Sequence, residues 1–461
     1  MSTIVLVLAV LALGAFYLGR NRATALASGT TGGLRGLHSL PGHYGLYTAL
    51  LCFLPAILLL FVWTLVEPSV ITSKVISDLP AETQELGKDR LGLVVNDIRN
   101  AVDGNVAPGS LSPEVEAAAA QYQSLRNTSA RLRTVFAVAL ALGGLAFGWR
   151  MINPQMRARN RVEGMVTAFL IACSMVAILT TLGIVLSVLF ESIRFFQRVP
   201  ATEFLFGTQW SPQTAIRADQ VGSSGAFGAI PLFVGTMLIA LIAMCVAAPI
   251  GLMSAIYLSE YAPRKVRAFA KPLLEILAGI PTVVYGFFAA LTVAPAIRGW
   301  GESVGLSVAS ESALAAGLVM GIMIIPFVSS LSDDVINAVP QAMRDGAYGL
   351  GATKSETVKN VIIPAALPGI VGGLLLAVSR AIGETMIVVM AAGLAANLTW
   401  NPLEAVTTVT VQIVTLLTGD QEFDSAKTLA AFALGLVLFV VTLVLNVIAL
   451  HVVRKYREQY E

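Results

Sequence analysis

The chain has 461 residues, of which 56% are hydrophobic and only 13% are charged, and its formal net charge is +2 at pH 7. A soluble globular protein carries about 25% charged residues, so this composition, with its mean hydropathy of +0.77, excludes an ordinary soluble domain. The nearly balanced charges show no basic patch, which gives no support for nucleic-acid binding. The composition therefore predicts a protein of the lipid bilayer.

A membrane-spanning helix needs about 20 predominantly apolar residues, and the sequence holds about nine runs that approach this length. Short polar loops separate most of these runs, which favours a bundle of helices over a β-barrel. We therefore expect an all-α polytopic membrane protein with about nine transmembrane helices. The expected spans are residues 4–18, 47–66, 134–149, 166–190, 230–258, 273–296, 313–330, 370–395 and 430–452.

The positions of lysine and arginine predict the orientation, because both residues favour the cytoplasmic side in short loops. Basic residues cluster on alternate loops and at the C-terminal end, so one topology satisfies all of them. It places the N-terminus outside and the C-terminus in the cytoplasm. By the count of spans, it also places segment 331–367 in the cytoplasm. The clusters are Arg20, Arg22 and Arg35; Arg150, Arg157, Arg159 and Arg161; Arg264, Lys265, Arg267 and Lys271; and Arg454, Lys455 and Arg457.

Several other signals argue against particular chemistries. The first apolar run has its arginines after it and none before it, which favours a retained anchor over a cleaved signal peptide. The segment 349–355 is not a phosphate-binding P-loop, because Thr353 occupies the position where glycine must precede the lysine. We expect no disulfide framework and no metal site. The residues in question are Cys52, Cys173 and Cys245, and His38, His43 and His451.

The chain divides into two zones by the distribution of unusual polar residues. Residues 1–165 predict an accessory region with about three spans and an external helical segment at 67–133, either a membrane anchor with a small cap or a regulatory part. Residues 166–461 hold six spans and the polar residues that are rare in membranes. Between its first two spans, 191–228 combines aromatic and glycine-rich stretches, which favours an ordered external piece at the membrane interface.

Segment 331–367 contains glycines that separate two short helical stretches, 340–348 and 354–362. The spacing predicts a helix–turn–helix knob, which either docks into a soluble partner or serves as a solvated connector. The segment resembles the EAA coupling loop of binding-protein-dependent ABC importers, with Asp for Glu at 345 and Gly for the first Ala at 346. The resemblance implies coupling to a separate ATPase. The matching positions are Asp345, Gly346, Ala347, Gly351 and the Pro364 that ends Val361-Ile362-Ile363-Pro364.

Two charged residues, Arg380 and Glu384, interrupt the eighth expected span about ten residues from its start. That position is roughly 15 Å deep, near the middle of a core of ~30 Å. Each charge costs around 2.5 to 3.5 kcal/mol there, so both should face the bundle interior. At positions i and i+4 they share a helix face. They form either a structural ion pair or a substrate gate, in which Arg380 binds an oxyanion and Glu384 competes for the guanidinium.

The sixth expected span contains Pro281, which lacks a backbone N–H and therefore predicts a kink with exposed carbonyl groups. Thr282 and Tyr285 follow it and add polar groups to an apolar segment. A kinked helix with such residues can line a path for a substrate or can simply pack against its neighbours. The sequence leaves both interpretations open.

Two motifs, Arg-Ala-Ile-Gly-Glu-Thr-Met at 380–386 and Gly-Ile-Pro-Thr-Val-Val-Tyr-Gly-Phe-Phe at 279–288, resemble the PstC-type permease of the bacterial phosphate ABC importer. The resemblance extends over residues 166 to about 455. It implies a type I ABC importer core of six helices in the inner membrane, with a path for inorganic phosphate. No catalytic residue and no cofactor are implied for this chain. The candidate residues for this path, selected by their positions in the expected spans, are Arg380, Glu384, Thr385, Thr282 and Tyr285.

The same resemblance implies partners outside this chain. They are a homologous second permease like PstA, an ATPase dimer like PstB that binds ATP and Mg, and a periplasmic phosphate-binding protein like PstS, besides membrane lipid. Other possibilities are transport of sulfate or molybdate, an ion-coupled secondary transporter, and a membrane sensor or scaffold. A secondary transporter would need titratable groups in both halves of an inverted repeat, whereas this chain has one strong charged cluster.

Overall fold

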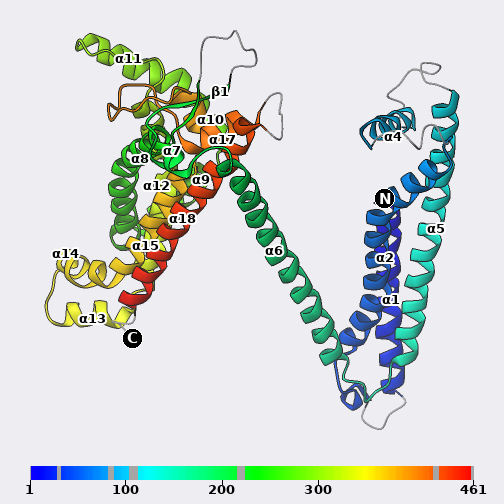
Figure 1. Ribbon diagram of the computed structural model, residues 1–461. Coiled ribbons are helices and arrows are strands. Elements are labelled where there is room, and N and C mark those ends of the chain that lie inside the picture. The colour runs from blue at the N-terminus through cyan, green and yellow to red at the C-terminus, as the bar shows by residue number, and fades with distance from the viewer. Residues whose placement is uncertain are drawn as a thin grey trace. The chain divides into compact units, whose positions relative to one another are not determined.

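The computed structural model describes residues 2–28, 33–80, 88–102, 113–214, 224–418 and 425–457. Within these ranges nine helices are long and apolar enough to cross a membrane, in agreement with the number expected. The chain forms two compact units, Met1–Leu179 and Thr180–Glu461, and the boundary falls inside helix α6 (Figure 1). The all-α prediction is therefore confirmed for the described residues, apart from one small hairpin.

Unit 1 is built on three long helices that run side by side, and α6 continues from its last loop (Figure 1). The helices approach closely where small residues face neighbouring backbone, as is common in membrane bundles. A Cβ atom at Gly144 would meet the carbonyl oxygen of Leu51, so only glycine fits there. The elements are α1 (Ser2–Ser28), η1 (Gly33–Gly36), α2 (Pro41–Ser77), α4 (Lys88–Val102), α5 (Pro113–Met151) and α6 (Ala158–Phe196).

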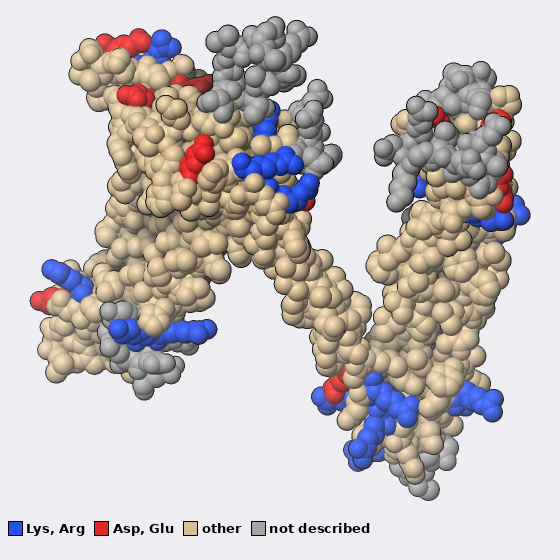
Figure 2. Space-filling model, viewed as in Figure 1, with Lys and Arg blue, Asp and Glu red and all other residues tan. Residues whose placement is uncertain are grey.

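The end of unit 1 that bears α4 carries a small apolar core of its own. Ile71 and Val75 of α2 pack there with Ile98 of α4 and with Ala118 and Ala119 of α5. On the face shown in Figure 2, a surface without charged residues separates this end from the opposite end, where Lys and Arg gather. Such a charge-free band is the surface expected of helices that contact lipid.

Unit 2 has a core formed mainly by α8 and α12, with α10, α15 and α16 packed against them. Three π-helical turns, η2, η3 and η4, interrupt its helices. The elements are α7 (Ala201–Phe206), β1 (Trp210–Thr214), β2 (Ser224–Phe227), α8 (Ile230–Ile256), η2 (Tyr257–Tyr261), α9 (Arg264–Ala278), α10 (Thr282–Phe288), η3 (Ala289–Val293), α11 (Ala294–Ser303), α12 (Ala313–Ala338), α13 (Gln341–Gly349), α14 (Lys354–Thr357), η4 (Val358–Ile362), α15 (Ile363–Ile382), α16 (Met386–Ala391), α17 (Val409–Leu417) and α18 (Ala426–Arg457).

The sixth expected span, 273–296, is wrong, because the helix breaks completely where only a kink was predicted. Helix α9 ends at Ala278, and α10 begins afresh after Pro281, whose backbone is extended at φ −57° and ψ 136°. Proline has no N–H to continue the helix and disfavours helical geometry in the residue before it. The apolar helix in this region is Thr282–Ser303, and α9 is a separate amphipathic helix without buried residues.

The eighth expected span, 370–395, is also displaced. The spanning helix is Lys354–Ile382, which includes η4, and it ends at Gly383. Just beyond this end, the Glu384 carboxylate accepts a hydrogen bond from the backbone N–H of Met386, 3.1 Å away. A side chain that bonds its own backbone in this way competes with helical hydrogen bonding. The two charges therefore lie at a helix end and not within a continuous helix.

Two other expectations are confirmed within the described residues. The ordered piece in 191–228 consists of α7 and an antiparallel hairpin in which Trp210 pairs with Phe227; residues 215–223 lie outside the described ranges. The helix–turn–helix knob consists of α13, followed by α14 and η4. Figure 1 shows α13, α14 and the C-terminus at one end of unit 2, and β1, α11 and α17 at the other.

Candidate functional site

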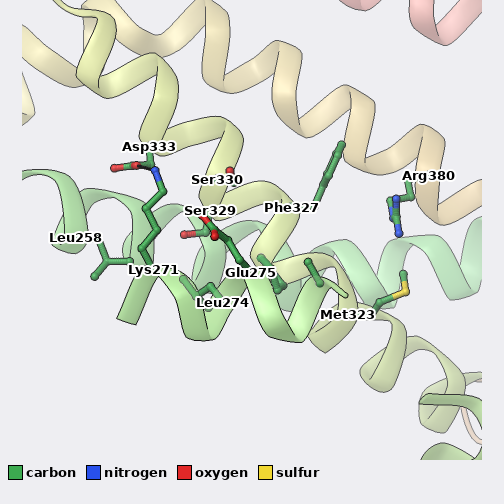
Figure 3. A pocket seen from close by; sticks show the side chains of 12 residues that line it. Leu258, Lys271, Leu274, Glu275, Met323, Phe327, Ser329, Ser330, Asp333 and Arg380 are labelled. Atoms are coloured by element: carbon green, nitrogen blue, oxygen red, sulfur yellow. Dashed lines mark hydrogen bonds and ion pairs between the residues drawn. The ribbon is translucent and has the colours of Figure 1, made fainter. Parts of the chain in front are cut away.

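A cavity of about 290 Å³ lies in unit 2 between α9, α12 and α15. One face of α12 lines it from Met323 to Asp333, a stretch of about 15 Å. In Figure 3 Asp333 and Lys271 lie toward one end of the lining and Arg380 toward the other. The lining residues are Leu258, Lys271, Leu274, Glu275, Ala278, Met323, Pro326, Phe327, Ser329, Ser330, Asp333 and Arg380.

Arg380 provides a positive charge at its end of the cavity. It lies in the last turn of α15, and its guanidinium carbon is 5.6 Å from the centre of the Phe327 ring, within the range of a cation–π contact. Among the described residues no carboxylate forms an ion pair with Arg380. Because arginine keeps its proton in proteins, this charge is permanent and is available to an anion.

Asp333 organises the opposite end of the cavity. It is only 4% exposed, and its carboxylate accepts hydrogen bonds from Lys271 Nζ at 2.9 Å and from Arg267 Nη2 at 3.1 Å. Asn337 Nδ2 donates to the same carboxylate at 2.9 Å. The hydrogen bond from Lys271 to Asp333 raises the pKa of Lys271, so the ammonium group stays protonated at neutral pH. Asp333 therefore holds α9 against α12 and fixes a second cation beside the cavity.

The arrangement of polar groups suits a small anion. The hydroxyl groups of Ser329 and Ser330 line the cavity between the two ends that carry Arg380 and Lys271. Hydroxyl, guanidinium and ammonium groups all donate hydrogen bonds to oxyanions. Glu275 contributes one negative charge to the same lining. The lining of this cavity thus combines two cations, two hydroxyl groups and two carboxylates.

The structure does not form the ion pair that was considered for Arg380 and Glu384. The Glu384 carboxylate accepts from the backbone of Met386, and its carbonyl oxygen accepts from Thr410 Oγ1 at 2.9 Å. Thr385 Oγ1 donates to the Gly383 carbonyl oxygen at 3.4 Å. The i, i+4 relation fails because the helix stops at Ile382. Of these residues, only Arg380 lines the cavity.

Tyr285 and Thr282 follow the other break in the core. The Tyr285 side chain is buried, and its hydroxyl donates to the carbonyl oxygen of Leu277 at 2.8 Å, which joins α10 to the end of α9. Thr282 is the first residue of α10. Neither residue lines the cavity, and Tyr285 satisfies a carbonyl that the break leaves open.

The sequence reasoning did not identify Asp333, Ser329 and Ser330. Their signal was available, since Ser330, Asp333 and Asn337 recur every three or four residues at the end of a predicted span. The basic run at 264–271 lies in the preceding cytoplasmic loop of the predicted topology and offers the complementary charges. A polar stripe of this kind within an apolar helix indicates a face that does not contact lipid.

The knob of α13 and α14 is anchored to the core on its inner side. Val358 and Ile362 are buried in one apolar cluster with Ile336 and Val339 at the end of α12, and Thr357 is buried as well. Helix α14 begins with a capping box, in which Thr353 Oγ1 accepts from the Glu356 N–H and the Glu356 carboxylate accepts from the Thr353 N–H. These bonds satisfy backbone donors at the helix start, so the knob is preorganised.

The outer side of the knob is exposed. Asp345 and Gly346 lie on the open side of α13, and Leu350, at the tip, is 91% exposed. Gly351 has φ +85°, a left-handed conformation that allows the sharp turn after α13. The remaining predicted positions are Ala347, which is 9% exposed, and Pro364, which is exposed in the first turn of α15.

An ion pair ties the knob to the end of α8. Arg344 Nη2 donates to Glu260 Oε1 at 3.1 Å, and the two side chains are only 11% and 9% exposed. Arg344 also donates to the carbonyl oxygens of Val339 and Ile336 at 2.6 and 2.8 Å. The Arg344 side chain thus joins its own helix, α13, to η2 and to the end of α12. A displacement of α13 must move these elements with it or break this contact.

Comparisons with known proteins give the following similarities. Residues 247–458 match a family described as binding-protein-dependent transport system inner membrane component, and residues 5–180 match one described as phosphate ATP-binding cassette transporter. The probable ABC transporter permease protein YqgH of Bacillus subtilis is 30% identical over 62% of this chain and 89% of that protein. The phosphate transport system permease protein PstC of Mesorhizobium japonicum is 33% identical over 53% and 76%. PstC 1 of Mycobacterium tuberculosis is 33% identical over 56% and 83%.

Proposed function

The chain belongs to the family of PstC-type permeases, inner membrane components of binding-protein-dependent transport systems, and from this premise we propose that it carries inorganic phosphate through an ATP-driven importer. The single observation that supports an oxyanion path is the cavity beside Arg380, whose guanidinium has no carboxylate partner among the described residues. The choice of phosphate over sulfate or molybdate follows from the names of the relatives.

The proposed path uses Arg380 as its central cation. Guanidinium groups bind phosphate oxygens in a fork, and the Ser329 and Ser330 hydroxyls add neutral donors. An arginine that is already paired with a carboxylate would bind phosphate less readily. The absence of an ion pair between Arg380 and Glu384 therefore favours phosphate binding in the conformation described. Glu384 would then compete for the guanidinium when the break after Ile382 changes its geometry. That competition releases the ion.

The two helix breaks lie near each other, which supports a role in the path for residues beside both. Helix α10 packs against α16, and a Cβ atom at Gly286 would lie 2.7 Å from Met390 Sδ. Broken helices at membrane depth are tolerated where they are buried in protein or line a cavity. Thr282 and Tyr285 at one break, and Thr385 at the other, are proposed to border the ion's route in a conformation reached during the cycle.

The knob is proposed to receive the push of a separate ATPase dimer that binds ATP and Mg. The exposed positions around Asp345 and the tip residue Leu350 would dock into a groove of that partner, and the Arg344–Glu260 pair would pass the motion to α8. Its end of unit 2 also holds the end of α18, which contains Arg454 and Lys455 and supports a cytoplasmic location. With the nine spans of the described residues, an odd number, this location supports an outside N-terminus. A second permease and an external phosphate-binding protein would complete the importer.

Uptake measurements test this function directly. Cells that lack the chain are complemented with wild type, Arg380→Gln, or Arg298→Gln, an exposed arginine of α11 outside the cavity. We expect phosphate uptake that requires ATP, resists excess sulfate, and is lost only in Arg380→Gln. Uptake that follows the proton gradient would indicate a secondary transporter, and competition by sulfate a different oxyanion. Uptake that is independent of the chain would indicate a sensor or scaffold.

A further inference from the structure

An apolar groove lies between α2 and the first part of α6 in unit 1. Its volume is about 520 Å³, and all the side chains that line it are apolar. Leu54, Leu58 and Phe61 of α2 contribute one wall, and Met165 and Phe169 of α6 contribute the other. The lining positions recur every three or four residues on each helix, so the groove follows the two helices along their length.

A cation lies at the end of this groove that is nearest the start of α6. Arg161 precedes Met165 by four residues, and Tyr47 precedes Leu54 by seven, so both continue the faces that line the groove. The Arg161 guanidinium carbon is 5.8 Å from the centre of the Tyr47 ring, and Arg161 Nη1 donates to the Tyr47 hydroxyl at 3.4 Å. Tyr47 is a neutral partner, and within the described ranges no carboxylate forms an ion pair with Arg161. Its charge is therefore available to an anion.

The surroundings of Arg161 are strongly basic. The first two basic clusters of the sequence, seven arginines in all, lie toward this end of unit 1, where Figure 2 shows Lys and Arg concentrated. Residues 1–66 and 134–179 contain one carboxylate, Glu163, so the formal charge of these residues is +6 (seven positive minus one negative). The Glu163 carboxylate accepts from Arg159 Nε at 2.6 Å. Glu163 therefore offsets Arg159 and leaves the charge of Arg161 uncompensated.

The groove runs from the level of the lipid headgroups into the hydrocarbon core. The Arg22 guanidinium carbon is 3.7 Å from the centre of the Trp149 ring at the same end of unit 1, and tryptophan favours the membrane boundary. Helix α6 carries no charged residue from 164 to 190. From Arg161 to Phe169 it rises by eight residues, or about 12 Å, which is most of one leaflet's share of a core of ~30 Å.

We propose that the groove between α2 and α6 binds an anionic phospholipid, with the phosphate group on Arg161 and one acyl chain between the helices. Basic pockets between transmembrane helices suit anionic headgroups, and a guanidinium binds phosphate oxygens in a fork. Arg157, which is also exposed at the start of α6, adds a second positive charge nearby. The apolar walls favour a lipid over free phosphate, which would contact only the charged end. This site does not depend on what the cavity at Arg380 transports.

The test uses the full chain purified from membranes together with the subunits that copurify with it. Phosphatidylglycerol and phosphatidylcholine with the same acyl chains are titrated separately, and the lipid bound per complex is counted by native mass spectrometry. Arg161→Gln removes the charge at the groove, whereas Arg20→Gln removes an exposed charge of the same end from α1, which does not line the groove. Ala168→Trp fills the groove without a change of charge, and Thr167→Trp places the same ring at an exposed position outside it.

We expect Arg161→Gln to weaken phosphatidylglycerol binding by about fivefold, because each basic residue near a membrane surface contributes about that factor toward anionic lipid. The same variant should bind phosphatidylcholine as the wild type does. Ala168→Trp should weaken the binding of both lipids, since it occupies the place of the acyl chain. Arg20→Gln and Thr167→Trp should match the wild type.

Equal phosphatidylglycerol binding by Arg161→Gln and Arg20→Gln would show only a diffuse attraction to the basic end, and this result would overturn the proposed site. Radiolabelled inorganic phosphate, measured in an Arg380→Gln background, tests the other source of the same chemistry. If Arg161→Gln loses this phosphate while Ala168→Trp binds both lipids normally, the ligand is free phosphate and the lipid proposal is wrong. The comparison of the two arginine variants decides alone if Ala168→Trp fails to fold.

Discussion

Both units carry prolines inside long continuous helices, such as Pro326 in α12 of unit 2, but two helix breaks distinguish unit 2 from the three long helices of unit 1. In unit 1, α2 runs unbroken over 37 residues although Pro55 and Pro68 lie within it, and Arg133 is paired with Glu67. In unit 2, the helices break after Ala278 and after Ile382, and Arg380 has no carboxylate partner among the described residues. Proline alone therefore does not break a membrane helix.

The difference lies in what surrounds each break. After Ala278, two residues, Gly279 and Ile280, precede Pro281, and the Tyr285 hydroxyl satisfies a freed carbonyl. After Ile382, glycine is followed by a carboxylate that bonds its own backbone. In each case a local polar partner replaces a helical bond, as non-helical backbone in a membrane requires. Unit 2 thus has two breaks whose freed backbone groups depend on nearby polar groups, whereas α2 of unit 1 is continuous.

The largest effect should come from the buried Arg344–Glu260 pair, which joins the knob to η2. Arg344→Gln leaves Glu260 as an uncompensated buried charge, which costs about 3 to 5 kcal/mol. We expect a large loss of thermal stability and of transport in the purified complex. The double variant Arg344→Gln, Glu260→Gln should recover much of the loss, because it leaves no unpaired charge. Equal instability of the single and double variants would show that the pair does not hold the knob.

The next effect concerns the cation of the candidate path. Arg380→Gln should lower phosphate uptake by about 100-fold, since two charge-assisted hydrogen bonds are lost at roughly 1.4 kcal/mol each. Arg380→Lys keeps the charge without the fork and should lose less. Initial uptake rates at matched expression measure both. Uptake by Arg380→Gln near the wild-type rate would remove this residue from the path.

A smaller effect should distinguish a proline at a helix break, Pro281, from a proline inside a continuous helix, Pro55. Pro281→Ala permits α9 to continue toward α10 and should lower uptake by about tenfold, since the broken geometry is lost. Pro55→Ala, inside the continuous α2 of unit 1, should leave uptake within about twofold. Phosphate uptake by vesicles reconstituted with each variant is measured under the same conditions. Equal effects at both positions would contradict the distinction between a functional break and a tolerated proline.

The smallest effect is the pH dependence of the contact between Lys271 and Asp333. The pKa of Lys271 is raised above its usual 10.5, so its contribution to stability is fully present below about that pH and is lost as the pH rises through the folded-state pKa. The contribution should be below about 1 kcal/mol, because Lys271 is more than a third exposed. Thermal unfolding of wild type and Lys271→Met should differ by a constant amount near neutral pH and converge at alkaline pH. A difference that grows as the pH rises would contradict the assignment.

Hydropathy predicted the number of spanning helices, and glycine spacing predicted the knob to within one residue, because both depend on local composition. The breaks were harder to predict. The run from Leu273 to Ala296 reads as one apolar segment, and only the neighbours that replace the lost hydrogen bonds decide between a kink and a break. The surroundings of Arg380 were also beyond the sequence, because Phe327 contacts it from another helix.

The exposed leucine at the tip of the knob also bears on how the protein is made. Leu350 is 91% exposed, beside an exposed Tyr348, on a part of the chain that projects away from the spanning helices. Water-exposed apolar side chains are what chaperones and quality-control proteases bind. Under the proposed docking the partner would cover this apolar tip, so a subunit made in excess of that partner would keep Leu350 in contact with water.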